Sequence, residues 1–159
     1  MGAWTTTTVG GKTEFRKEMG EIIRAHHIPY AALASISQPL DLFKKVTKAK
    51  SIKGPKYIEI LAPCPPGWRF SMDKTVEMGD LAIETGAWAL YEVENDVVTF
   101  NGKSKLLLEG KIDRKPVEEW IKYQGRFRHL FKPKKDVQRI KAIEDHVDEK
   151  WERYRKRYL

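Results

Sequence analysis

The only cysteine of this sequence lies in a proline-rich loop. Cys64 follows Pro63 and precedes Pro65-Pro66-Gly67-Trp68. Each proline fixes its backbone φ near about −65°, which holds the direction of the neighbouring thiol. The loop follows the strand-like run 57–61, and functional groups of open α/β sheets gather at the carboxyl ends of strands. Cys64 is therefore a candidate metal ligand. The alternative is a packed cysteine, because free cysteine is often buried.

The sequence contains no second thiol to complete a metal site. An iron–sulfur cluster takes about four cysteine ligands, so any cluster at Cys64 must be shared with other residues outside this sequence. Dinucleotide, phosphate-loop, nucleophile-elbow and paired-cysteine motifs are absent. The four histidines, at positions 26, 27, 129 and 146, lack metal-ligand spacing. The sequence thus offers Cys64 as a metal ligand and no candidate catalytic residue.

The composition is that of a globular protein of single-domain size. The 159 residues are 41% hydrophobic, which is enough for a core. The sequence has neither an apolar run of about 18 residues nor a signal-peptide pattern, so we expect a cytoplasmic protein without a membrane partner. The net charge is +8, most of it after Lys111, and this basic face suits an acidic protein, a nucleic acid or an anionic membrane.

Apolar periodicity in the first half predicts alternating helices and strands. We expect helices over 19–26 and 39–50 and strands over 30–36 and 57–62. Ser37 is the expected N-cap of the second helix, whose apolar residues Leu40, Phe43 and Val46 recur at helical spacing. This order is typical of a parallel sheet with right-handed crossovers. Because two strands do not make a stable sheet, either a later hairpin or another polypeptide must complete it.

The second half predicts a hairpin followed by helices. Asp73 can cap a helix that ends near Gly86, strands over 89–93 and 97–100 form a hairpin, and Pro116 starts a short helix. An apolar stripe from Val137 to Tyr158 predicts a long helix that packs on its own domain or on a subunit, with stacking on bases as the alternative. The predicted fold is α/β: a partial parallel sheet with flanking helices over residues 1–87, then a hairpin and a basic helical extension over 88–159.

Several sequence blocks occur in the order found in a known family. They are Gly2-Ala3-Trp4-Thr5-Thr6-Thr7, Ile28-Pro29-Tyr30-Ala31-Ala32, Ala34-Ser35-Ile36, Pro39-Leu40-Asp41, Gly54-Pro55-Lys56-Tyr57-Ile58, Leu61-Ala62-Pro63-Cys64-Pro65-Pro66-Gly67-Trp68, Pro116-Val117-Glu118-Glu119 and Gln124-Gly125-Arg126-Phe127-Arg128-His129-Leu130. Together they resemble the carboxyl-terminal half of the β subunit of pyruvate:ferredoxin oxidoreductases, the thiamine-diphosphate-binding 2-oxoacid:ferredoxin oxidoreductase family.

The resemblance implies a function within a larger enzyme. The family decarboxylates a 2-oxoacid on thiamine diphosphate, passes electrons through a [4Fe–4S] cluster to ferredoxin, and forms acetyl-CoA from pyruvate and CoA. By this resemblance Cys64 is the last of the four cluster ligands. The resemblance also implies other enzyme subunits as partners, and acidic ferredoxin as a partner of the basic tail.

The sequence departs from the family pattern in two respects. The family's amino-terminal cysteines are absent, and so is the Gly-Asp-Gly-Asp segment that holds magnesium and diphosphate. We therefore expect the isolated chain to hold neither thiamine diphosphate nor a cluster, to be inactive alone, and to be a fragment, a split subunit or an engineered piece of a longer protein. The choice of 2-oxoacid stays open, with pyruvate the nearest match.

Two other functions remain open. A small basic module could bind RNA or protein through Arg126, Arg128, Arg153 and Arg157, although nucleic acid is the less favoured partner. A degenerate structural subunit is the other alternative, in which Cys64 only packs.

Overall fold

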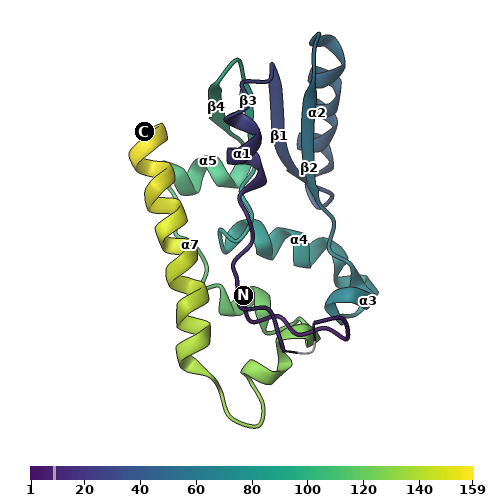
Figure 1. Cartoon of the computed structure of the whole chain (residues 1–159), viewed down its shortest axis with the longest axis vertical. Helices are drawn as coiled ribbons and strands as arrows, with labels where there is room; N and C mark the ends of the chain where they lie inside the picture. Colours follow the sequence, from purple (N-terminus) through teal and green to yellow (C-terminus); the bar gives the residue numbers. More distant parts are fainter. Residues whose placement is uncertain (9) are drawn as a thin grey trace.

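A computed structural model describes residues 1–8 and 10–159 of the chain (Figure 1). The described chain contains a four-stranded sheet with the order β2-β1-β3-β4. The strands are β1 (Tyr30–Ser35), β2 (Lys56–Leu61), β3 (Tyr91–Glu94) and β4 (Val97–Phe100). The predicted partial sheet with flanking helices and a hairpin is confirmed.

The first two strands form the predicted parallel pair. β1 and β2 run in register from Tyr30 opposite Lys56 to Ser35 opposite Leu61. Helix α2 (Pro39–Ser51) connects them. All six residues of β1 are buried, as expected for a central strand covered on both faces.

The hairpin completes the other side of the sheet. β3 pairs antiparallel with β1 and β4 pairs antiparallel with β3, so the sheet is mixed, and only β1 and β2 are parallel. Asn95 and Asp96 turn the hairpin with φ values of 47° and 67°, the conformation that a two-residue primed turn requires. The hairpin thus supplies part of the sheet that two strands alone lacked.

Helix α2 forms where predicted, but its buried face is not the predicted one. Leu40 and Phe43 are 77% and 71% exposed, and Val46 is 39% exposed. The buried residues are Lys45 and Ala49. Lys45 Nζ donates to the backbone oxygen of Leu33 at 2.8 Å and to Asp41 Oδ2 at 2.7 Å. The small side chain of Ala49 and this satisfied lysine therefore decide which side of α2 meets the sheet.

Of the remaining helices, some lie beside the strands and others lie beyond one end of the sheet (Figure 1). They are α1 (Met19–Arg24), α3 (Pro65–Trp68), η1 (Met72–Lys74), α4 (Thr75–Glu84), α5 (Gly102–Leu108), α6 (Glu118–Ile121), η2 (Gly125–Leu130) and α7 (Val137–Tyr158). The two predicted caps are wrong. Gln38 is the N-cap residue of α2, and Lys74 is that of α4. Ser37 instead forms a hydrogen bond with Ser35, and Asp73 lies within η1. None of the helices in the described part of the chain has the length and apolarity that a membrane crossing requires.

Helix α7 packs its apolar stripe against the rest of the chain. Trp151 is 1% exposed and Tyr154 is 5% exposed, and both rings lie against Phe100 of β4. The main core continues from β1 through α4 to this helix. The prediction that the stripe packs, in preference to stacking on bases, is confirmed.

Candidate functional site

Cys64 lies just beyond the carboxyl end of β2, at the start of α3. Its thiol is exposed. Pro65 occupies the first turn of α3, and the Trp68 backbone N–H donates to the Cys64 backbone oxygen at 2.8 Å. This one-turn helix ties the position of Cys64 to that of Trp68.

Gly67 leaves space beside the thiol. A Cβ built on Gly67 would lie 3.3 Å from Cys64 Sγ, a close contact that only glycine avoids without a shift. An exposed thiol with this clearance and with a proline on each side fits the geometry of a cluster ligand. No group of three or more histidine, cysteine or acidic side chains in residues 1–8 and 10–159 is arranged to hold a metal ion. The described residues therefore offer one exposed thiol for such a group and not a whole set of ligands.

Arg126 and Trp120 hold Trp68 in place. The Arg126 guanidinium lies 4.0 Å from the centre of the Trp68 ring, and its Nε donates to Gln124 Oε1 at 2.8 Å. Burial lowers the pKa of Arg126 to about 10, so the guanidinium stays charged at neutral pH. The Trp120 ring meets Trp68 edge-on at 5.8 Å. These contacts fix one side of the cysteine loop.

A second contact joins the same loop to η2. Arg69 adopts φ 59°, and its backbone oxygen accepts a hydrogen bond from the Gly125 N–H at 2.9 Å. A Cβ on Gly125 would lie 2.6 Å from Arg69 Cβ and 2.9 Å from that oxygen. Only glycine permits this approach, so residues 124–126 form one unit with the cysteine loop.

The amino-terminal segment lies over the other side of this unit. Trp4 N–H donates to the Arg126 backbone oxygen at 2.8 Å, and the Arg69 guanidinium lies 5.0 Å from the centre of the Trp4 ring. Gly2 N–H donates to the Lys12 backbone oxygen at 2.8 Å. Three segments that are distant in the sequence, around Trp4, Trp68 and Arg126, thus meet at this point.

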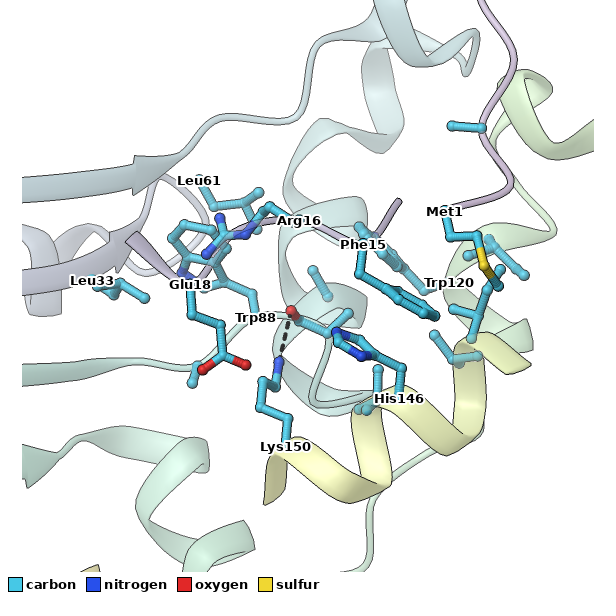
Figure 2. A pocket seen from close by; sticks show the side chains of 18 of the residues that line it. Met1, Phe15, Arg16, Glu18, Leu33, Leu61, Trp88, Trp120, His146 and Lys150 are labelled. Atoms are coloured by element: carbon cyan, nitrogen blue, oxygen red, sulfur yellow. Dashed lines mark hydrogen bonds between the residues drawn. The ribbon is translucent and has the colours of Figure 1, made fainter. Parts of the chain in front are cut away.

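A cavity of about 350 Å³ is lined by Trp68, Arg126 and residues of α7. Figure 2 shows the cavity with Trp120, His146 and Lys150 among its lining residues. The Phe15 and His146 rings stack across it at 3.7 Å, and the Arg16 guanidinium lies 4.4 Å from the centre of the Trp88 ring. Burial lowers the pKa of His146, which favours the neutral ring in this stack. The lining is mainly apolar and aromatic.

Lys150 of α7 is the buried amine of this cavity. Its Nζ donates to the backbone oxygens of Gly86 at 2.7 Å and of Ala87 at 3.1 Å, and Trp151 Nε1 donates to the same Gly86 oxygen at 2.9 Å. Burial lowers the pKa of Lys150 to about 7. Because it donates to the backbone oxygens of Gly86 and Ala87, Lys150 ties α7 to the loop that follows α4.

Comparison with known proteins finds close relatives over nearly the whole chain. The ketoisovalerate oxidoreductase subunit VorB of Pyrococcus abyssi is 43% identical over 161 residues, covering 98% of this chain and 48% of the relative. The pyruvate synthase subunit PorB of Pyrococcus horikoshii is 45% identical over 156 residues, 88% of this chain and 47% of the relative. That of Methanothermobacter marburgensis is 45% identical over 152 residues, 92% of this chain and 49% of the relative.

The chain is homologous to half of a 2-oxoacid:ferredoxin oxidoreductase β subunit. The matching part is the carboxyl-terminal half. The chain spans about half the length of the curated relatives it matches. A scan against protein-family models finds no match. The resemblance inferred from the sequence blocks is thereby confirmed.

The structure of this β-subunit homologue does not gather the four arginines considered for nucleic-acid binding. Arg126 lies against Trp68, Arg153 pairs with Glu18 at 2.6 Å, and Arg157 pairs with Glu21 at 3.0 Å. Arg128 is exposed on η2. The aromatic residues Trp151 and Tyr154 that would stack on bases are buried.

Sequence reasoning missed two features of the β-subunit homologue. The first is the role of Arg126 as the partner of Trp68, for which the sequence carries no signal because the two residues are far apart in the chain. The second is Lys150, which lies on the apolar stripe of α7 three residues after Val147 and directly before Trp151. A lysine inside a stripe of buried positions is a signal that the sequence did contain.

Proposed function

We propose that the chain forms the carboxyl-terminal half of the β subunit of a 2-oxoacid:ferredoxin oxidoreductase, with pyruvate as the 2-oxoacid and CoA as the acceptor. In this proposal Cys64 supplies one of the four thiolate ligands of a [4Fe–4S] cluster. The exposed Cys64 thiol, with the space that Gly67 leaves beside it at the carboxyl end of β2, is the observation that carries the proposal. When bound, such a cluster passes electrons from the cofactor to ferredoxin.

The chain's own residues position the thiol. The prolines restrict the backbone on both sides of Cys64, and α3 transmits the position of Trp68 to it. Arg126 and Trp120 both contact the Trp68 ring and hold it in place. A rigid ligand keeps the distance between donor and acceptor groups constant, as electron transfer requires.

Thiamine diphosphate and magnesium do not fit the residues present here. The sequence lacks the Gly-Asp-Gly-Asp segment, and no acidic cluster of the described chain is arranged for a metal ion. We therefore assign the binding of thiamine diphosphate, magnesium and the 2-oxoacid to other parts of the complete enzyme, and derive no step through them in this chain.

The surface beside the cysteine loop suits an acidic partner. Arg128 on η2 and Lys132 and Lys134 just beyond it are exposed, and η2 packs against α3. Opposite charges on two proteins speed their encounter. We assign the docking of an acidic ferredoxin to this side of the chain.

Replacement of Cys64 tests the proposal. We would produce the chain with a carboxyl-terminal tag, together with the remaining subunits of its oxidoreductase, and purify the complex without oxygen. Cys64→Ser is expected to lower the iron and sulfide content and to abolish pyruvate- and CoA-dependent dye reduction. Ser51→Ala is the matched control, because this exposed hydroxyl donates only to the nearby Lys48 backbone oxygen at 2.8 Å.

Two outcomes would contradict the assignment of Cys64 as a cluster ligand. If Cys64→Ser leaves both the iron content and the turnover of the assembled complex unchanged, the thiol only packs and the chain is a structural subunit. If the Ser51→Ala complex loses iron as well, the loss does not arise from the thiol.

A further inference from the structure

We infer that the cavity of about 350 Å³ beside Trp68 is a binding site for a small aromatic carboxylate. The carboxylate pairs with Arg126, the ring lies among the aromatic side chains of the cavity wall, and an oxygen on the ring accepts a hydrogen bond from Trp88 Nε1. The inference goes beyond the proposed function, because it involves neither Cys64 nor a cluster.

Trp88 gives the first reason to expect a ligand. Its side chain lines the cavity and is 5% exposed (Figure 2). Its Nε1 is buried and has no hydrogen-bond acceptor among residues 1–8 and 10–159. Most buried N–H groups of native proteins do have an acceptor. An oxygen atom of a bound molecule would supply the acceptor that Trp88 lacks.

Arg126 gives the second reason. Its Nε donates to Gln124 Oε1 at 2.8 Å, and its guanidinium lies over the Trp68 ring. Burial lowers its pKa, and no acidic side chain of the described residues offsets this loss of solvation. A partly buried guanidinium that no carboxylate balances favours an anion. Its terminal N–H groups match a carboxylate in a bidentate pair.

The other charges of the cavity wall also favour an anion. Among the described residues that line it, basic side chains outnumber acidic ones: they are Lys12, Arg16, Arg126 and Lys150 against Glu18. Glu18 pairs with Arg153 at 2.6 Å, and Arg16 pairs with Glu59 at 2.9 Å. The wall therefore carries an excess of positive charge, which attracts anions.

The rest of the wall indicates the kind of anion. Phe15 stacks on His146, and Trp68 meets Trp120 edge-on, so aromatic rings form much of the lining. The cavity volume of about 350 Å³ lies within the range of small-molecule sites. An inorganic anion would leave these apolar surfaces without a contact, whereas an aromatic ring packs on them. The wall thus suits a carboxylate that carries an aromatic ring.

Calorimetric titration with three probes tests the inference. 4-Hydroxyphenylacetate carries the carboxylate, the ring and the additional oxygen, 4-hydroxyphenylacetamide lacks the negative charge, and phenylacetate lacks the hydroxyl group. The purified chain is expected to bind 4-hydroxyphenylacetate, and to bind its amide at least about tenfold more weakly. Phenylacetate is expected to bind about threefold more weakly than 4-hydroxyphenylacetate, because Trp88 Nε1 then stays without an acceptor.

Three variants locate the site. Arg126→Gln is expected to bind 4-hydroxyphenylacetate at least about tenfold more weakly. Arg139→Gln removes an exposed guanidinium of α7 that does not line the cavity, so it is expected to bind the probe as the wild type does. Trp88→Phe is expected to bind 4-hydroxyphenylacetate and phenylacetate equally, because it lacks the N–H that distinguishes them. Circular dichroism of each variant checks that the chain still folds.

Four results would overturn the inference: no binding of 4-hydroxyphenylacetate, equal affinities for this acid and its amide, equal affinities of the wild type for this acid and phenylacetate, or equal losses in Arg126→Gln and Arg139→Gln. Binding by the chain but not by the assembled oxidoreductase would also overturn it, because another part of the enzyme would then fill the cavity.

Cys64→Ser separates the inference from the proposed function. Cys64 does not line the cavity, so this variant is expected to bind 4-hydroxyphenylacetate as the wild type does. A loss of iron with intact probe binding therefore concerns the cluster alone. A wild-type complex that holds iron but does not bind the probe contradicts the cavity inference alone.

Discussion

Lys150 shows how a single buried amine can couple two helices. The Lys150 amine and the Trp151 indole both donate to the Gly86 backbone oxygen just after α4. A Cβ on Gly86 would lie 2.3 Å from Trp151 Nε1, so the glycine lets the indole approach. The orientation of α7 therefore depends on a backbone oxygen of the loop that follows α4.

This buried amine predicts a pH dependence of stability. The ordinary pKa of 10.5 falls to about 7 in the folded chain. Between these values the unfolded chain binds more protons, so the free energy of unfolding rises with pH, by up to about 1.4 kcal/mol per pH unit from this group. Urea unfolding at pH 7 and pH 9 measures the effect.

Comparison with two lysine variants isolates the contribution of Lys150. In Lys150→Met, the free energy of unfolding is expected not to show the rise with pH that Lys150 causes. Lys156→Met, at an exposed position of the same helix, is expected to keep it. Equal slopes in the wild type and in Lys150→Met would show that the amine is not held in its neutral form. The amino terminus, whose pKa burial lowers from 8.0, contributes equally to all three chains.

At the level of elements, α1 presses its backbone against the sheet. A Cβ on Gly20 would lie 2.1 Å from Tyr91 Oη and 2.6 Å from Leu33 Cδ1. The helix can reach β1 this closely only because position 20 has no side chain. This glycine could not be singled out from the sequence, because the contact involves residues distant in the chain.

Gly20→Ala is therefore expected to destabilise the chain by about 1–3 kcal/mol, since the added methyl group overpacks the core. The change acts against the helix propensity of alanine, which alone would stabilise α1. Gly10→Ala, with no atom within 4 Å of the added Cβ, is the control and should be nearly neutral. Thermal unfolding of both variants measures the difference. Equal melting midpoints for Gly20→Ala and Gly10→Ala would contradict the tight contact at Gly20.

The elements also show which sequence patterns are enough to predict a helix or a strand. β1, β2, the hairpin and α7 were all predictable, because each has a clear apolar period or a recognisable turn. The buried face of α2 was not, because the stripe of Leu40, Phe43 and Val46 points away from the chain's own core. A periodic pattern tells that a helix has an apolar face, but not which polypeptide covers it.

For the whole molecule, the fold pairs several basic side chains with acidic ones, so they are not all free to bind a polyanion. Arg153 and Arg157 pair with Glu18 and Glu21 of the α1 region, and Arg114 pairs with Glu144 and Asp148 of α7. Such pairs reduce the field that a polyanion meets. The sequence shows how many charges exist, whereas their pairing depends on the fold.

We therefore expect the isolated chain to bind poly(U) RNA weakly and to release it at about 0.2 M salt, as non-specific phosphate contacts do. Fluorescence anisotropy at increasing salt concentration measures this. Affinity that persists at high salt and falls on Arg128→Ala would favour a true RNA-binding module, which the buried aromatic stripe argues against.

The candidate site was predictable only in part. Cys64 could be selected from its prolines and from the strand before it. The residues that hold the loop, Arg126, Trp120 and Gly125, come from a different region of the chain, and one sequence contains no record of such distant contacts. The other ligands of the proposed cluster lie outside this chain, so they could not be predicted from its sequence.

The placement of the amino terminus has a practical consequence. Met1 lines the cavity beside Trp68 and Arg126, and Gly2 is buried with φ 80° against Ile143 and Leu130. A fusion partner or affinity tag ahead of Met1 would have to leave through this crowded region. Leu159 is 75% exposed at the opposite end of α7. The carboxyl terminus is thus the better attachment point for purification handles, fluorophores or surface immobilisation.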